Sequence, residues 1–308
     1  MKYFFAIILV VAFLSSCSKS VGEKQNTSNS DTAVNQQITE IQQTVSFPAL
    51  YTEEDSAYYE NLYKTLSQSI DKDQELGEII VKVGKNWLNI PYTANTLETT
   101  GGEKLVVRFS SFDCVTFLEN TLAVSRLLKA EKNTFHNFLE ELKNIRYRNG
   151  VIIDYTSRLH YFSDWLFNKT EMNIVNDISK QIGGIAAKKT INFMTTHKES
   201  YNPLVNSTIF NEIENLEKDI SQREYFYIPK NKVEENETDI KNGDLILITT
   251  SVEGLDIAHV GFAYFQNGRL HFLHASSSEQ KVVISEKPLA DYLASVSKHT
   301  GILVARAL

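Results

Sequence analysis

Apolar residues recur at helical spacing in the first half of the chain. The stretches "SAYYENLYKTLSQSI" and "ELGEIIVKVGKNWLNI" both show this spacing. Pro91 ends the second predicted helix, because the residue before a proline leaves the helical region. A loop with a Gly-Gly turn then leads to a short predicted strand at residues 105–109. The stretch "CVTFLENTLAVSRLL" follows as another helix, with a buried face at Val115, Leu118, Leu122 and Leu128.

The pattern changes near residue 243. The region from about 131 to 240 is predicted to be mostly helical, whereas "DLILITT", "IAHVGFAYF", "RLHFLHA" and "KVVIS" are short apolar or alternating runs beside turn-prone "KNGD" and "QNG". Strands this close together are antiparallel, because a parallel crossover needs a dozen or more residues. A short helix, "PLADYLASV", and a strand, "GILVARAL", end the chain. The predicted fold class is therefore α+β.

The first residues form a pattern of their own. Lys2 precedes an apolar run from Tyr3 to Leu14, which is too short for an ordinary membrane-spanning helix and is typical of a secretory signal peptide. The run ends in "LSSC", which resembles the lipobox of bacterial lipoproteins, where cleavage before the cysteine is followed by lipidation of its thiol. We therefore expect a signal peptide at residues 1–16 and a lipid on Cys17. The alternative is a plain secretory signal in which this cysteine is incidental.

The segment after the signal is polar. "SKSVGEKQNTSNSDTAVNQQ" has no apolar periodicity and predicts a flexible tether, which we place at residues 17–46. The folded domain is expected at residues 47–308, with a helical insertion at about 131–240.

Composition and charge narrow the class of protein. The chain has 308 residues, of which 42% are hydrophobic and 22% charged, as expected for a folded protein with a sizeable core. The formal net charge of -7 argues against a nucleic-acid partner, since such proteins usually carry a basic surplus. The histidines fit no zinc motif and no nucleotide-binding glycine motif is present, so we expect no metal and no cofactor.

The second cysteine is the first candidate for chemistry. If Cys17 carries a lipid, Cys114 has no intramolecular partner. Ser111 or Asp113 is a good N-cap, which puts Cys114 in the first turn of its helix. There the helix dipole and free N–H groups would lower the pKa of the thiol and bind the oxyanion of an attacked carbonyl. The helix alone is equally consistent with a buried apolar cysteine.

Two histidines on predicted strands could complete such a site, since cysteine catalysis needs a base and a group that orients it. Strand alternation gives His259 the same face as Gly261 and Ala263, and we expect the cysteine helix to lie against these small residues. The "QNG" hairpin brings His274 beside His259, where it can fix the tautomer. His271 faces away. The alternative is a structural histidine, which is the usual role of a single histidine taken alone.

Several stretches in the same order resemble a known superfamily. "PY", "FDC", "HVGFAY" and "LHAS" resemble the NlpC-type cysteine peptidase superfamily of bacterial cell-wall hydrolases, which share a papain-like core. Within it, "LVVRFSSFDCVTFLEN", "SRLHYFSDWL" and "LHASSSEQKVVIS" resemble the N-acetylmuramoyl-L-alanine amidase-like family. The resemblance covers roughly Trp87 to the C-terminus. It implies a papain-like core, with the antiparallel sheet packed on the cysteine helix and a family-specific helical insertion.

The resemblance also implies the roles of four residues. Cys114 would be the nucleophile, His259 the base and His274 the group that orients the base. Tyr92 in "IPYT" matches a tyrosine near the oxyanion hole. The chain departs from the superfamily pattern after this tyrosine, where "TANTLE" replaces Trp-Gly-Gly, and at "DCVT", where the superfamily usually has "DCSG".

Other polar residues are candidates for substrate binding. Ser157, Arg158 and His160 lie in "SRLHYFSDW", within the predicted insertion, and could contact the carboxylates and hydroxyls of a muropeptide. The alternative is a structural turn. Asp256 in "GLDIAHV" could line the cleft or cap a turn.

The implied activity is cleavage of the amide between N-acetylmuramic acid and L-alanine in peptidoglycan or muropeptides, through a thiolate and an acyl-enzyme. Two alternatives remain open: an endopeptidase that cuts the stem peptide after D-glutamate, and a catalytically inactive, lipid-anchored module that binds glycan or peptide. The expected partners are this substrate and a membrane, reached through the lipid on Cys17. We infer no protein partner and expect a location in the cell envelope, facing the periplasm.

Overall fold

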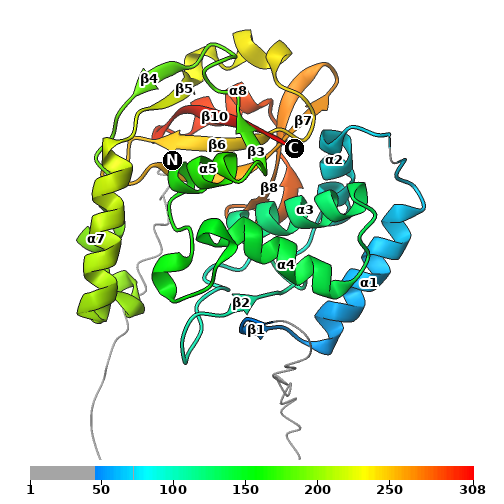
Figure 1. Cartoon of the computed structure of the whole chain (residues 1–308). Helices are drawn as coiled ribbons and strands as arrows, with labels where there is room; N and C mark the ends of the chain where they lie inside the picture. The colour runs from blue at the N-terminus through cyan, green and yellow to red at the C-terminus, as the bar shows by residue number, and fades with distance from the viewer. Residues whose placement is uncertain (1–45, 72) are drawn as a thin grey trace, which may run out of the picture. The chain divides into compact units, whose positions relative to one another are not determined.

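Helices pack against a large antiparallel sheet in the computed structural model, which describes residues 46–71 and 73–308 (Figure 1). The predicted signal peptide, Cys17 and the tether as far as residue 45 lie outside the described residues. Within the described ranges, no helix is both long enough and apolar enough to cross a membrane.

The predicted helices before and after the cysteine form. The first, α1, begins with a capping box, in which the side chains of Thr52 and Asp55 each accept a hydrogen bond from the other's backbone N–H. The helices are α1 (Glu53–Ser67), α2 (Leu76–Asn86), α3 (Cys114–Lys129), α4 (Phe135–Arg146), α5 (Phe162–Glu171), α6 (Phe193–Thr196), α7 (Ser207–Gln222) and α8 (Leu289–Ser295). Helix α3 is almost entirely buried, which makes it the central helix of the core.

The large sheet has the strand order β4-β5-β10-β6-β7-β8-β9, and β3 also pairs with β10. Its strands are β3 (Val175–Asp177), β4 (Ile185–Ala187), β5 (Tyr225–Pro229), β6 (Leu245–Thr250), β7 (Ile257–Gln266), β8 (Arg269–Ser276), β9 (Lys281–Ile284) and β10 (His299–Ala307). Every pairing in it is antiparallel. A separate parallel pair joins β1 (Ala49–Leu50) to β2 (Leu105–Val106). The α+β class and the antiparallel meander are therefore confirmed.

The region predicted to be mostly helical, about 131–240, is only partly so. It contributes α4 to α7, but also β3, β4 and β5, which extend the large sheet beyond β10 (Figure 1). These strands have three to five residues each. Such short segments carry too few positions to show a strand period, and their hydrogen-bonding partners are distant in the sequence.

The two faces of the sheet pack on different cores, which corrects one expectation. Val260 and Phe262 of β7 face the core that contains α3, and the rings of Phe117 and Phe262 lie 5.9 Å apart. Ala263 faces the other core, with Phe272. The body of the cysteine helix therefore packs on the face opposite to the small residues, and not against them as expected.

Gly261 has a different neighbour from the one predicted. A Cβ atom at this position would lie 2.6 Å from the Leu273 carbonyl oxygen and 2.8 Å from both the Phe272 ring and the His274 Cβ. The absence of a side chain therefore lets β8 approach β7 closely, which brings the histidines of the two strands together.

Candidate active site

The cysteine lies at the first residue of α3. Asp113 is the N-cap: its Oδ1 accepts a hydrogen bond from the Thr116 N–H at 2.7 Å, and its own N–H donates to Thr116 Oγ1 at 2.9 Å. This reciprocal capping box fixes the turn that carries Cys114. The predicted position of the cysteine in the first helical turn is confirmed.

The segment containing Tyr92 runs beside this turn. Residues Tyr92 and Phe112 form a parallel bridge, and the Phe112 N–H donates to the Pro91 carbonyl at 3.0 Å. The Tyr92 N–H donates to the carbonyl of Gln280 at 2.9 Å. Trp87, which is fully buried, packs under the turn with its ring 5.0 Å from that of Phe112. Tyr92 is therefore held close to the cysteine although "TANTLE" separates the two segments.

The two predicted histidines are paired. His259 Nε2 and His274 Nδ1 are 2.6 Å apart. A bulge between β6 and β7 pairs Ile257 with Thr249 and His259 with Ile248, so one extra residue of β7 sets the direction of His259. His271 lies apart from this pair, with its Nδ1 2.8 Å from the carbonyl of Ser285. The predicted juxtaposition of His259 and His274 is confirmed.

The N-terminal turn of α3 carries Cys114, and this helix contacts β7. The thiol interacts there with the backbone N–H of Val260, the residue that follows His259. Burial raises the pKa of Cys114 to about 12, and the carboxylate of Asp113 adds to this rise. The N–H groups of Val260, Val115 and Cys114 itself lower the pKa but do not outweigh the burial. The N–H groups at the start of α3 lower the pKa as expected, but burial outweighs them, so the net shift is upward and favours the thiol.

The histidine pair is also uncharged at rest. Burial, with a smaller contribution from His299, lowers the pKa of His259 to about 3, although its side chain keeps some exposure to solvent. Burial and His259 hold the pKa of His274 well below its usual range. A neutral imidazole carries one N–H, so a proton on His259 Nε2 can be donated to His274 Nδ1. That tautomer leaves Nδ1 of His259 free to accept a proton.

A neutral resting site predicts an unusual pH dependence for alkylation of Cys114. Only the thiolate reacts, so with a pKa of about 12 the rate with iodoacetamide should keep rising, by about tenfold per pH unit, beyond about pH 9. An ordinary thiol, with a pKa of about 8.5, would level off there. Peptide mass spectrometry gives the rate at Cys114 separately from Cys17. A plateau below about pH 7 would instead reveal a preformed thiolate–imidazolium pair.

The structure adds two residues that the sequence analysis missed. Tyr292 of α8 packs its ring 5.5 Å from that of His274, and His299 of β10 lies 5.9 Å from Tyr292. No local sequence signal marks either residue. His299 reaches the site only because β10 pairs with β6 in the interior of the sheet.

Three candidate substrate-binding residues are engaged in structural contacts. Arg158 is 5% exposed and donates to the Leu97 carbonyl at 3.1 Å and to Glu98 at 2.8 Å, which ties down the loop after Tyr92. The hydroxyl of Ser157 donates to a carbonyl in its own turn, and His160 Nε2 lies 2.8 Å from the carbonyl of Tyr155. Within the described residues, no hydrogen bond or ion pair joins these side chains to Cys114, and their role toward substrate stays a prediction.

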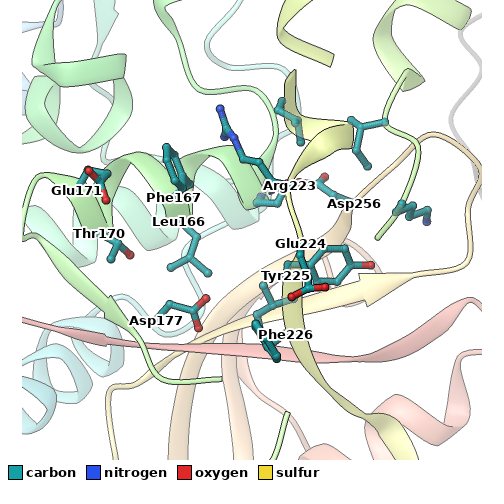
Figure 2. A pocket seen from close by; sticks show the side chains of 15 residues that line it. Leu166, Phe167, Thr170, Glu171, Asp177, Arg223, Glu224, Tyr225, Phe226 and Asp256 are labelled. Carbon is teal, nitrogen blue, oxygen red and sulfur yellow. Dashed lines mark hydrogen bonds between the residues drawn. The ribbon is translucent and has the colours of Figure 1, made fainter. Parts of the chain in front are cut away.

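Asp256 caps a helix and also lines a cavity. Its carboxylate accepts the N–H groups of Ser163, in the first turn of α5, and of Ile257, both at 2.7 Å. The adjoining cavity has a volume of about 160 Å³. Figure 2 shows side chains of α5 and β5 around it. Cys114, His259 and His274 are not among its lining residues. Within the described ranges, no cluster of three or more acidic, histidine or cysteine side chains could hold a metal ion.

The fold and the site define an α+β protein with a cysteine at the first residue of a buried helix, which contacts the two strands that carry the histidine pair. A family model described as AmiA-like, N-acetylmuramoyl-L-alanine amidase-like, matches residues 82–302. The chain belongs to this amidase-like family, which confirms the family resemblance seen in the sequence. No curated protein matches the chain.

Solved structures agree with this family. An N-acetylmuramoyl-L-alanine amidase from Bacteroides uniformis is 37% identical, with a TM-score of 0.72, and the match covers 75% of this chain and 98% of that one. A Bacteroides fragilis protein, provisionally described as a xylanase, is 38% identical, with a TM-score of 0.70 and coverage of 73% and 99%. A Legionella pneumophila protein that is 24% identical shares the fold, with a TM-score of 0.62 and coverage of 83% and 95%.

Proposed function

We propose that this protein hydrolyses the amide between N-acetylmuramic acid and L-alanine in peptidoglycan or its fragments, with Cys114 as nucleophile. The observation that carries the proposal is a pair of histidines on strands that lie beside the cysteine helix. His259 Nε2 lies 2.6 Å from His274 Nδ1, and the backbone N–H of Val260, the residue after His259, interacts with the Cys114 sulfur. Membership of the amidase-like family and the Bacteroides uniformis relative support this choice of bond.

The first half of the reaction forms an acyl-enzyme. His259 Nδ1 takes the proton of the Cys114 thiol as the sulfur attacks the carbonyl carbon of the lactyl group. The charge moves to the carbonyl oxygen, where the backbone N–H groups at the start of α3 and the hydroxyl of Tyr92 can donate. His274 Nδ1 accepts a hydrogen bond from the Nε2–H group of His259 and so stabilises the imidazolium. His259 then protonates the amine of L-alanine, the C–N bond breaks, and a thioester remains.

The second half regenerates the thiol. His259 is neutral again and takes a proton from a water molecule that attacks the thioester carbonyl. The C–S bond breaks, the proton on His259 returns to Cys114, and the lactyl carboxylic acid leaves and releases its proton to solvent. Because both groups are uncharged at rest, proton transfer and attack are expected to occur together and not from a stored thiolate.

Digestion of a purified disaccharide–tetrapeptide with analysis of the products by mass tests the proposal. The expected products are the intact disaccharide with a free lactyl carboxylate and a peptide with a free L-alanine amino terminus. A disaccharide–dipeptide would identify the endopeptidase alternative, which cuts after D-glutamate. Binding without any product would identify the inactive binding module.

The xylanase description of one relative has no counterpart in this site. Glycoside hydrolysis uses two carboxyl groups that flank the scissile bond. The carboxylate next to Cys114 belongs to Asp113, which caps α3. Xylan is therefore a suitable control substrate, and we expect no release of sugar from it.

The remaining predictions from the sequence belong to the same proposal. We propose that the fold is a member of the papain-like, NlpC-type superfamily, and that a lipid on Cys17 anchors the enzyme at the periplasmic side of the cell envelope. Incorporation of a labelled fatty acid into the wild type but not into Cys17→Ala tests the anchor.

A further inference from the structure

A phenylalanine on β8 packs against both imidazoles of the histidine pair. The ring of Phe272 is stacked on that of His274, with the centroids 4.5 Å apart and an angle of 20° between the planes. The same ring meets that of His259 edge-on, at 5.5 Å and 73°. Phe272 is fully buried, and it lies two residues before His274 on the same face of the strand. One aromatic ring therefore contacts both members of the pair.

The space for this ring comes from small residues of β7. Phe272 lies directly opposite Ala263 across the ladder between β7 and β8. A Cβ atom at Gly261 would lie 2.8 Å from Cε2 of the Phe272 ring, which is closer than a side-chain atom can approach without displacing the ring. The small residues that follow His259 on one face of β7, which we expected to receive the cysteine helix, therefore receive the Phe272 ring instead.

The position of Phe272 is fixed by the fold before any substrate arrives. Its N–H donates to Ser285 Oγ at 3.0 Å, and its carbonyl accepts the N–H of Ser285 at 2.8 Å. Its ring also contacts that of Tyr292 in α8, at a centroid distance of 5.8 Å. The backbone and the ring are thus held from separate elements of the fold.

The hydrogen bond between the two histidines does not by itself fix the planes of their rings. The χ2 torsion of a histidine is broad, so an imidazole turns easily unless a neighbour restrains it. The contact of 2.6 Å between His259 Nε2 and His274 Nδ1 sets a distance, and the two planes stand at 88° to each other. A flat ring against one imidazole and an edge against the other can restrain both planes. Phe272 supplies both contacts.

We propose that Phe272 is a positioning residue for the proposed reaction. It holds the planes of both imidazoles, so that His259 keeps its Nε2 on His274 and leaves its Nδ1 free to take a proton. Phe272 itself exchanges no proton and touches no reacting atom. The effect on turnover rests on the proposed function, whereas the effect on the geometry of the histidine pair does not.

The Phe272→Leu variant removes the flat ring and keeps an apolar side chain in the core. We expect kcat for muropeptide cleavage to fall by about 10- to 100-fold, because a small misplacement of a catalytic group costs up to about this much. KM should change by less than about twofold, since the histidines act in the chemical step.

The geometry of the pair is measured directly by proton–nitrogen correlation spectra of protein with labelled histidine. The hydrogen-bonded N–H between His259 and His274 is protected from exchange with water, and its signal is assigned by its loss in His259→Ala. In Phe272→Leu the signal should disappear, because the rings turn and the N–H exchanges with solvent.

Two further variants separate positioning from a general loss of packing. Phe138→Leu is the matched control, because Phe138 of α4 is fully buried in the core on the other face of the sheet, with its ring 4.8 Å from that of Tyr59. It should lower stability to urea, but leave kcat and the histidine signal as in the wild type. Phe272→Met fills the space with a flexible side chain and should behave as Phe272→Leu, even if the leucine variant folds poorly.

The inference is overturned if the histidine signal persists in Phe272→Leu and Phe272→Met, or if both variants keep the wild-type kcat. An equal fall of kcat in Phe138→Leu would also overturn it and show that the ring only packs. If the wild type cleaves no muropeptide, the proposed function is wrong, and the histidine signal still decides the role of Phe272.

Discussion

Replacing Cys114 by alanine is expected to reduce kcat/KM for muropeptides by about 10⁴-fold or more. The mechanism has no second nucleophile, and removal of one member of a catalytic unit costs about as much as removal of all of them. Product formation is measured by mass over long incubations, with binding of the same muropeptide measured in parallel. Turnover that survives the substitution would exclude Cys114 as the nucleophile.

The loss in this variant should be chemical and not structural. Cys114 is only partly buried, and the reciprocal bonds between Asp113 and Thr116 that begin α3 do not involve its side chain. Cys114→Ala should therefore keep the wild-type melting temperature and bind substrate. Cys114→Ser is a matched variant that keeps a polar side chain but carries a weaker nucleophile, and it should be nearly as inactive.

Much of the site could be predicted because its parts are set by local signals. The capping pattern around Asp113 placed Cys114 in a first helical turn, and a hairpin with a short turn placed the strand of His274 beside the strand of His259. Alternation along these strands then put His259 and His274 on one face. Each of these steps depends on residues that are close together in the sequence.

The parts that could not be predicted depend on long-range pairing. Strand β10 lies between β5 and β6, so His299 reaches the site from the end of the chain. The ion pairs of Arg158 with Glu98 and Glu103 join segments that no sequence pattern connects. The net rise in the pKa of Cys114 could not be predicted for the same reason. The N–H groups of the helix N-terminus, which lower this pKa, are a local feature, whereas the burial that outweighs them is made by the whole fold.

A second large effect is expected beneath the cysteine, in the body of α3. Arg146 of α4 donates from Nε to Glu119 of α3 at 2.6 Å and from Nη1 to the Val106 carbonyl at 2.6 Å. Both charged side chains are 1% exposed. Arg146→Met should lower the free energy of unfolding by about 3–5 kcal/mol, because it leaves the carboxylate buried without its partner. Urea unfolding measures the change.

The cost should come from the unpaired charge and not from the lost side-chain volume. The double variant Glu119→Gln/Arg146→Met removes both charges, so it should recover part of the stability that Arg146→Met loses. Lys218→Met breaks an exposed pair with Glu214, whose side chains are 60% and 44% exposed, and should change stability by less than about 1 kcal/mol. If Arg146→Met were as mild as this control, Glu119 would have to be protonated in the folded protein. Burial already raises the pKa of Glu119, and this shift favours the protonated state.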